Sequence, residues 1–145
     1  MFGIFPNGSP INENDEMVLP TSIIIDSFTE PVHIPLSYWN FDDYKQSWLM
    51  SLKEGIHSKK HAALAVSMYE PDHTNFIFVW VVYFSDNEVF VQNSILFLDE
   101  CPGFTPKNIN NFIEPRTTHN EDGMKISEWH TDLKSILDFY NTLKG

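Results

Sequence analysis

The pattern of apolar and polar positions first predicts short strands near the N-terminus. Between residues 17 and 36 there are three apolar clusters, and the last of them alternates with a period of two, which is typical of a strand. The clusters are separated by Pro20, Pro31 and Pro35. Because proline lacks the backbone N–H that a central ladder needs, we expect these segments to be short strands at the edge of a sheet.

Three further apolar segments predict a meander of strands over residues 62–69, 75–84 and 88–98. The turn formers Glu70-Pro71-Asp72-His73 and Ser85-Asp86-Asn87 separate them. The middle segment is a continuous apolar run rather than an alternating one. We therefore expect both faces of this strand to be covered and the strand to lie in the centre of its sheet.

Two segments carry apolar residues at helical spacing. The first, residues 41–54, has Asn40 as a candidate N-cap and Gly55 as the expected C-terminal stop. The last, residues 132–143, follows Thr131, which we take as its N-cap. Two main helices packed on a mostly antiparallel sheet of four or five strands predict an α+β fold.

The chain of 145 residues has the length of one domain, which we place at residues 17–145. Residues 1–16 are dense in glycine, proline and asparagine. These residues favour turns, so we expect an N-terminal arm that lies over the domain.

The charge balance narrows the possible partners. Twenty acidic and nine basic residues give a formal net charge of -11, which repels nucleic acid and attracts basic proteins. The single cysteine, Cys101, cannot form an internal disulfide, and the longest apolar run is too short to cross a membrane as a helix. We expect a soluble cytoplasmic protein that binds neither nucleic acid nor membranes, and that is a monomer or a weak dimer.

The sequence contains little that predicts catalysis. It has no Gly-x-Ser-x-Gly motif, and its six glycines are scattered rather than clustered as in a phosphate-binding loop. His57 and His61 have metal-ligand spacing, but Lys59 and Lys60 lie between them. Acidic neighbours raise the pKa of Cys101, which disfavours a nucleophilic thiolate. We expect no catalytic residues, no metal and no cofactor.

Two histidines leave an enzymatic alternative open. His119 and His130 flank the Glu121-Asp122-Gly123 turn, and either could form an acid–base pair with Glu128 or Asp132. A small enzyme with such a pair is the first alternative. The second is an acidic adaptor that binds a basic cellular protein.

The main interpretation is an interaction module. Acidic residues concentrate at the predicted loop tips, and the domain is rich in tryptophan and tyrosine, which often anchor interfaces. A negative surface also accelerates docking onto a basic partner. The candidate contact residues are Tyr69, Glu70, Asp72, Asp99, Glu100, Glu121 and Asp122.

Several long strings resemble a known family. They include Ile34-Pro35-Leu36-Ser37-Tyr38-Trp39, Ser67-Met68-Tyr69-Glu70-Pro71 and Val91-Gln92-Asn93-Ser94-Ile95-Leu96-Phe97-Leu98-Asp99-Glu100. In this order and spacing they resemble the immunity proteins of bacterial contact-dependent growth inhibition systems, over about residues 28–143.

This resemblance implies a non-enzymatic protein that neutralises the toxic C-terminal domain delivered by a neighbouring cell. Many such toxins are nucleases, so the implied partner is a basic toxin domain whose active site the protein covers. A nuclease active site receives phosphates, and an acidic inhibitor suits it. The resemblance assigns no contact residues, and it does not include residues 1–16.

Overall fold

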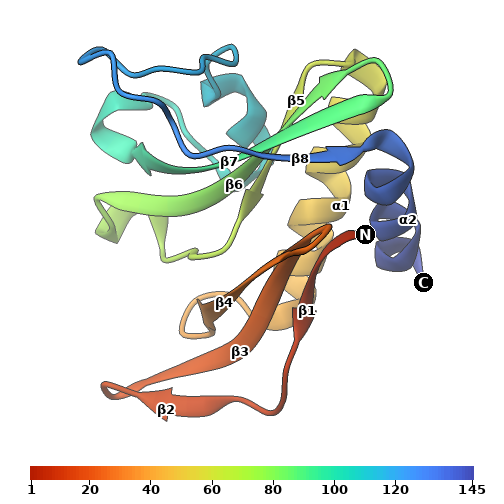
Figure 1. The fold of residues 1–145 in the computed structure, drawn as a ribbon. Helices are drawn as coiled ribbons and strands as arrows, with labels where there is room; N and C mark the ends of the chain where they lie inside the picture. The colour runs from red at the N-terminus through yellow and green to blue at the C-terminus, as the bar shows by residue number, and fades with distance from the viewer.

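The computed structural model describes residues 1–145 as two four-stranded antiparallel sheets with two long helices (Figure 1). The first sheet contains β1 (Phe2–Pro6), β2 (Ile11–Glu13), β3 (Glu16–Ile25) and β4 (Phe28–Pro35). The second contains β5 (His61–Ala65), β6 (Phe76–Ser85), β7 (Glu88–Phe97) and β8 (Trp129–Asp132), in that order. The helices are α1 (Phe41–Ser58) and α2 (Leu133–Lys144). Short 3₁₀ helices are η1 (Pro71–His73), η2 (Leu98–Glu100) and η3 (Pro106–Phe112). The α+β class is confirmed, but the number of strands is eight in two sheets rather than four or five in one.

The prediction of an N-terminal arm over residues 1–16 is wrong, because these residues form part of the first sheet. β1 and β2 pair in turn with one side of β3, and Phe2 and Ile4 are buried in the core. The Phe2 ring packs edge-on against Phe139 of α2 at a centroid distance of 5.6 Å. The turn formers of this segment occupy the connections between the strands rather than an irregular arm.

The prolines behave as expected in β4 but not in β3. β4 is an edge strand, and along it residues whose backbone groups bond to β3 alternate with residues whose backbone groups point to the outside of the sheet. Pro31 and Pro35 belong to the second kind. Their missing N–H groups therefore remove no hydrogen bond between β3 and β4. Pro20, however, lies inside a ten-residue strand. The Pro20 carbonyl accepts from the Asn7 N–H at 2.9 Å, so the backbone of Pro20 faces the connection between β1 and β2. No continuous strand lies opposite Pro20 on this side, and its missing N–H therefore interrupts no ladder.

Helix α1 is longer than the sequence predicts. Asn40 is the N-cap as expected and forms a capping box with Asp43. Gly55 does not end the helix, which continues to Ser58 and closes at Lys59 in the left-handed conformation. A Cβ at Gly55 would lie 2.5 Å from the His61 carbonyl oxygen, so glycine permits a close approach between α1 and β5.

The C-terminal elements also differ in detail. The N-cap of α2 is Asp132, whose side chain accepts from the Ser135 N–H at 2.8 Å, and not Thr131. β8 begins at Trp129 and leads directly into α2. Thr131 instead lies buried in β8 and donates to Asp26 at 3.0 Å, which joins the two sheets.

The fold covers the β5 edge of the second sheet with side chains. The indole N–H of Trp48 donates to the Ala65 carbonyl at 2.8 Å, and the Ser51 hydroxyl donates to the Ala63 carbonyl at 2.7 Å. The Ala63 N–H donates to the Asn110 side chain at 2.8 Å. Side chains thus engage three outward groups of β5, namely the Ala63 N–H and the carbonyls of Ala63 and Ala65, and they obstruct the addition of another strand at this edge.

Candidate interaction surface

Four large apolar side chains form an exposed patch across β6 and β7. Phe76 lies opposite Phe97 and Phe78 lies opposite Ile95, so all four share one face of the sheet. They are 42–48% exposed. We call this set the β6–β7 patch. The prediction that both faces of this strand are covered therefore holds for Val79 to Val82 but is wrong at its start.

Phe78, Ile95 and Phe97 of the patch line an open cleft between the two sheets. At one end of this face, Trp129 of β8 packs on Phe28 of β4 with centroids 4.6 Å apart, and the sheets are in contact. Farther along, β4 diverges and leaves a cleft of about 590 Å³ between residues 30–33 and the β6–β7 patch. The one acidic residue of its lining is Glu30, and the lining contains no lysine or arginine. The cleft can therefore receive a partner segment that is apolar and basic.

Four of the predicted contact acids meet at the end of the β6–β7 patch. Glu70 and Asp72 lie at η1, just before β6, while Asp99 and Glu100 lie in η2, just after β7. The Leu98 N–H donates to the Asn75 carbonyl at 2.9 Å and joins these two segments. All four acids are exposed. The structure thus brings acids that are 27 to 30 positions apart in sequence to one end of the patch. We call these four residues, Glu70, Asp72, Asp99 and Glu100, the acidic rim.

The remaining two predicted acids, Glu121 and Asp122, lie elsewhere along the chain. They occupy an exposed turn that is closed by the Gly123 N–H, which donates to the Asn120 carbonyl at 3.0 Å. Neither residue lines the cleft between the sheets.

Tyr69, the predicted aromatic anchor, is half-buried and already engaged. Its hydroxyl donates to the Glu16 carboxylate at 2.8 Å. Burial and this neighbouring carboxylate raise the pKa of Tyr69 to about 12. The bond ties the β2–β3 hairpin to the loop after β5, so only the ring of Tyr69 is free for a partner.

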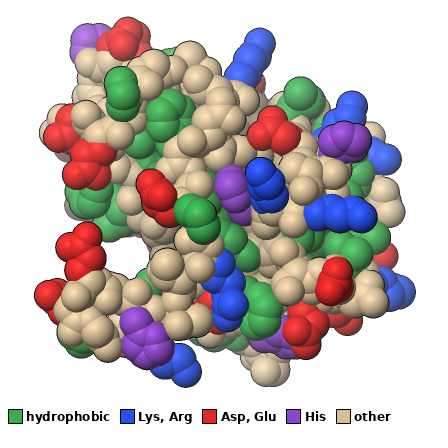
Figure 2. All heavy atoms as spheres, turned by 90° about the horizontal axis from the view of Figure 1, so that it is seen from above, with side chains coloured by type: hydrophobic (Ala, Val, Ile, Leu, Met, Phe, Trp, Pro, Cys, Tyr) green, Lys and Arg blue, Asp and Glu red, His purple; other side chains and the backbone are tan.

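Charge is distributed unevenly over the molecule. Figure 2 shows that the left of the face seen from above carries acidic side chains with few basic ones, while on its middle and right lysine and arginine are mixed with acidic side chains. A net charge of -11 combined with this asymmetry gives the acidic side a strong negative potential.

The two candidate catalytic histidines lie on open surface. His130 is 55% exposed and its Nε2 lies 3.5 Å from the Glu88 carboxylate, which is itself 64% exposed. His119 lies in a β-bridge with Lys125, and its Nδ1 is 2.9 Å from the Thr118 hydroxyl. These are solvated polar contacts, and neither imidazole lines the cleft between the sheets.

Glu128 anchors the long connection between η3 and β8. Its carboxylate accepts two hydrogen bonds from the Arg116 guanidinium, at 2.6 and 2.7 Å, and one from the Gln92 side chain at 2.7 Å. Mainly because of Arg116, the pKa of Glu128 is held below its ordinary value of 4.5. The carboxylate thus serves as a structural anchor rather than as the partner of a catalytic histidine.

Acidification should therefore loosen this connection. Because the pKa of Glu128 is lower in the folded state, its contribution to stability is complete above the unfolded pKa and is lost as the pH falls through the folded pKa. We expect the melting temperature of the wild type to fall more steeply below pH 4.5 than that of Glu128→Gln. Thermal melts across this range measure the difference, and parallel curves would contradict the assignment.

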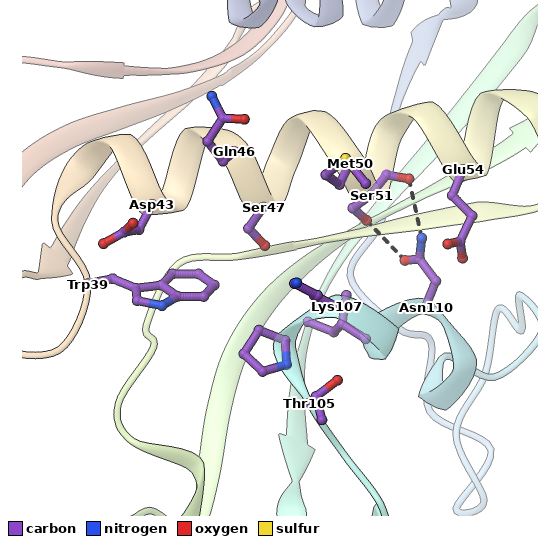
Figure 3. Close-up of a pocket in the computed structure, with 12 residues that line it drawn as sticks. Trp39, Asp43, Gln46, Ser47, Met50, Ser51, Glu54, Thr105, Lys107 and Asn110 are labelled. Atoms are coloured by element: carbon purple, nitrogen blue, oxygen red, sulfur yellow. Dashed lines mark hydrogen bonds between the residues drawn. The ribbon is translucent and has the colours of Figure 1, made fainter.

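A second groove lies between α1 and η3 (Figure 3). Its volume is about 430 Å³, and Trp39, Met50 and Lys107 are among its lining residues. At its base the Asn110 side-chain oxygen lies 3.0 Å from the Ser51 hydroxyl, and the Asn110 side-chain amide donates to the Ser51 carbonyl at 3.2 Å, as the dashed lines show. The groove is thus built around the buried polar contact that covers the β5 edge.

Removing this contact should destabilise the protein. We expect Asn110→Ala to lower the free energy of unfolding by about 2 kcal/mol, because the Ala63 N–H is left buried without an acceptor. Asn111, the next residue in the chain, is exposed and provides the control. We expect Asn111→Ala to change the free energy of unfolding little. Urea denaturation measures both, and equal stabilities would refute the role of Asn110.

The structure also bears on the expectations about Cys101, metal binding and membrane-spanning helices. Burial, followed by Glu100 and Asp99, raises the pKa of Cys101, in the direction that the sequence predicts. No group of three or more His, Cys, Asp or Glu side chains is arranged to hold a metal ion. Neither long helix combines the length and apolar character needed to span a membrane.

Comparison with known proteins gives three concordant results. Residues 34–139 match the family model described as the CdiI N-terminal domain. The chain is 63% identical to the immunity protein CdiI of Enterobacter cloacae subsp. cloacae, over the full length of both. It also matches a chain of the solved CdiA-CT/CdiI toxin and immunity complex from Enterobacter cloacae, with a TM-score of 0.97, 62% identity and 99% coverage of both chains.

Proposed function

Because this chain belongs to the CdiI immunity protein family, we propose that it binds and neutralises the toxic C-terminal domain of a cognate CdiA-type protein. The similarity covers nearly the whole chain, and the matching solved structure is a complex of toxin and immunity protein. These two facts support a protein toxin as the partner.

The observation that supports the interface best is the exposed β6–β7 patch with its acidic rim. Protein interfaces commonly have an apolar, aromatic centre and a polar border. Phe76, Phe78, Ile95 and Phe97 provide the centre. Glu70, Asp72, Asp99 and Glu100 provide a border of negative charge, and the ring of Tyr69 is a further candidate contact. Glu121 and Asp122 form a second acidic segment that adds to the negative potential.

We infer that the toxin is a nuclease and that the immunity protein covers its active site. A nuclease binds phosphates through basic side chains, so an acidic rim is attracted to the same groups as the substrate. Binding there excludes nucleic acid both sterically and by charge. This proposal accounts for the excess of acidic residues on a protein that itself repels nucleic acid.

The proposal makes the chain a non-catalytic inhibitor that acts in the cytoplasm, as a monomer or weak dimer. The exposed positions of His119 and His130 favour binding over acid–base catalysis, because neither imidazole lies in a pocket that could hold a substrate against it. An acidic adaptor differs only in its partner, and the match to a toxin complex favours the toxin.

Co-expression with the toxin domain encoded beside this gene tests the proposal. We expect growth to be rescued, the two proteins to co-purify, and nuclease activity to be inhibited at equimolar ratio. Growth arrest despite soluble immunity protein would refute the function. Rescue with undiminished nuclease activity in the purified complex would refute only the covering of the active site.

A further inference from the structure

The fold protects two strand edges but leaves a third open. The β5 edge is covered by Trp48, Ser51 and Asn110, and the β4 edge carries Pro31 and Pro35 at outward positions. Both devices prevent the addition of a further strand. The outer edge of β7 has neither of them.

β8 covers only the first part of the β7 edge. It pairs with Glu88–Val91, whereas β7 continues to Phe97 along β6. The Leu133 N–H donates to the Asn87 carbonyl on the β8 side, and the Leu98 N–H donates to the Asn75 carbonyl on the β6 side, both at 2.9 Å. Since successive residues of a strand point their backbone groups to opposite sides, odd-numbered positions of β7 face outward.

Three residues of β7 that lie beyond its pairing with β8 therefore have unpaired backbone groups. Asn93, Ile95 and Phe97 direct three N–H and three C=O groups away from β6, and no strand pairs with them. Their side chains are exposed. The segment 93–97 spans about 17 Å and contains no proline, lysine or other charged residue that would discourage pairing.

We propose that the toxin domain docks by adding an extended segment as a strand to the β7 edge at residues 93–97. This inference rests on the proposed function and specifies its interface. Backbone hydrogen bonds to the three outward residues supply binding and register. Apolar side chains of the added strand pack beside Ile95 and Phe97, and its lysine or arginine side chains approach Asp99 and Glu100 at the end of β7.

Charge decides between a toxin segment and a second copy of this chain at the same edge. Two copies each carry a net charge of -11 and repel one another. A basic segment is attracted by the acidic rim beside Phe97. The edge is therefore suited to a basic partner rather than to self-association.

Amide hydrogen exchange tests the proposal on the wild-type protein. We expect NMR to show that the amides of Asn93, Ile95 and Phe97 exchange at least about tenfold more slowly when a nuclease-inactive toxin domain is bound. The amides of Ser94 and Leu96 face β6 and serve as internal references. If the complex forms and the three edge amides exchange as before, strand addition is refuted while the proposed function stands. If no complex forms, the proposed function itself fails.

A pair of variants at one position separates backbone from side-chain contributions. Ile95→Pro removes an outward N–H without removing a bond to β6, whereas Ile95→Ala removes more of the apolar side chain but keeps the N–H. We expect Ile95→Pro to bind the toxin domain at least about tenfold more weakly than Ile95→Ala. Equal affinities of two folded variants would overturn the proposal. Should Ile95→Pro not fold, the exchange experiment decides.

Light scattering identifies the competing occupant. We expect the free protein to keep the mass of one chain over the concentrations used for NMR. A mass that rises with concentration, together with protection of the three edge amides in the free protein, would assign the edge to a second copy and overturn the proposal.

Discussion

Replacing Phe78 and Phe97 together by serine is expected to lower the affinity for the toxin domain by about a thousandfold and to abolish growth protection. Large aromatic side chains at the centre of an interface typically contribute about 2 kcal/mol each, and about 1.4 kcal/mol corresponds to a factor of ten. Phe78 is 46% and Phe97 48% exposed in the free protein, so their removal should change the free energy of unfolding little.

The control for this prediction is an apolar residue exposed outside the β6–β7 patch. Met50 lies on α1 and is 64% exposed, which makes Met50→Ser a suitable match. Calorimetric titration measures the affinities, and circular dichroism monitors the fold. Wild-type affinity of Phe78→Ser/Phe97→Ser would place the interface outside the β6–β7 patch.

Reversing the charge of Asp99 and Glu100 is expected to slow association with the toxin domain by about tenfold at low salt. Long-range attraction between opposite charges accelerates encounter by about ten- to a thousandfold and is screened as salt is added. The wild-type on-rate should therefore fall between about 50 and 500 mM NaCl, while that of Asp99→Lys/Glu100→Lys should change less. Stopped-flow or surface-based kinetics measures both.

Two further pairs of substitutions separate local charge from net charge. Each double reversal changes the net charge from -11 by four units to -7. Glu54→Lys/Glu114→Lys lies away from the acidic rim and should slow association least, and Glu121→Lys/Asp122→Lys reports on the second acidic segment. Equal effects of all three pairs would show that only net charge matters, and an on-rate independent of salt would refute electrostatic steering.

Local sequence features predicted much of the secondary structure. The Asn40 capping box, the helical spacing of Tyr44, Trp48 and Leu52, and the hairpin between β6 and β7 depend on neighbours a few residues apart. Such interactions are encoded within one segment. The α+β class follows from them, because amphipathic helices and apolar strands must bury one another.

Prediction from local sequence features failed where contacts with distant segments determine the secondary structure. Residues 1–16 were expected to form an arm because they are rich in turn formers, but β3 provides a partner for β1 and β2. Gly55 suggests a stop for α1, but it lies inside the helix, at the point where β5 approaches the helix backbone. Local preferences are small compared with the burial and pairing gained in tertiary contacts.

The candidate surface shows the same division. The sequence by itself determined that this is an acidic α+β chain with four acids placed at loops before β6 and after β7. Only the tertiary structure decided that these loops share one rim, that Tyr69 is engaged by Glu16, and that the start of the apolar run is uncovered. The physical reason is that an apolar strand is buried only where another layer lies over it. Here β4 diverges from the second sheet and the pairing of β7 with β8 stops at Val91, which leaves the β6–β7 patch and the β7 edge open to a partner.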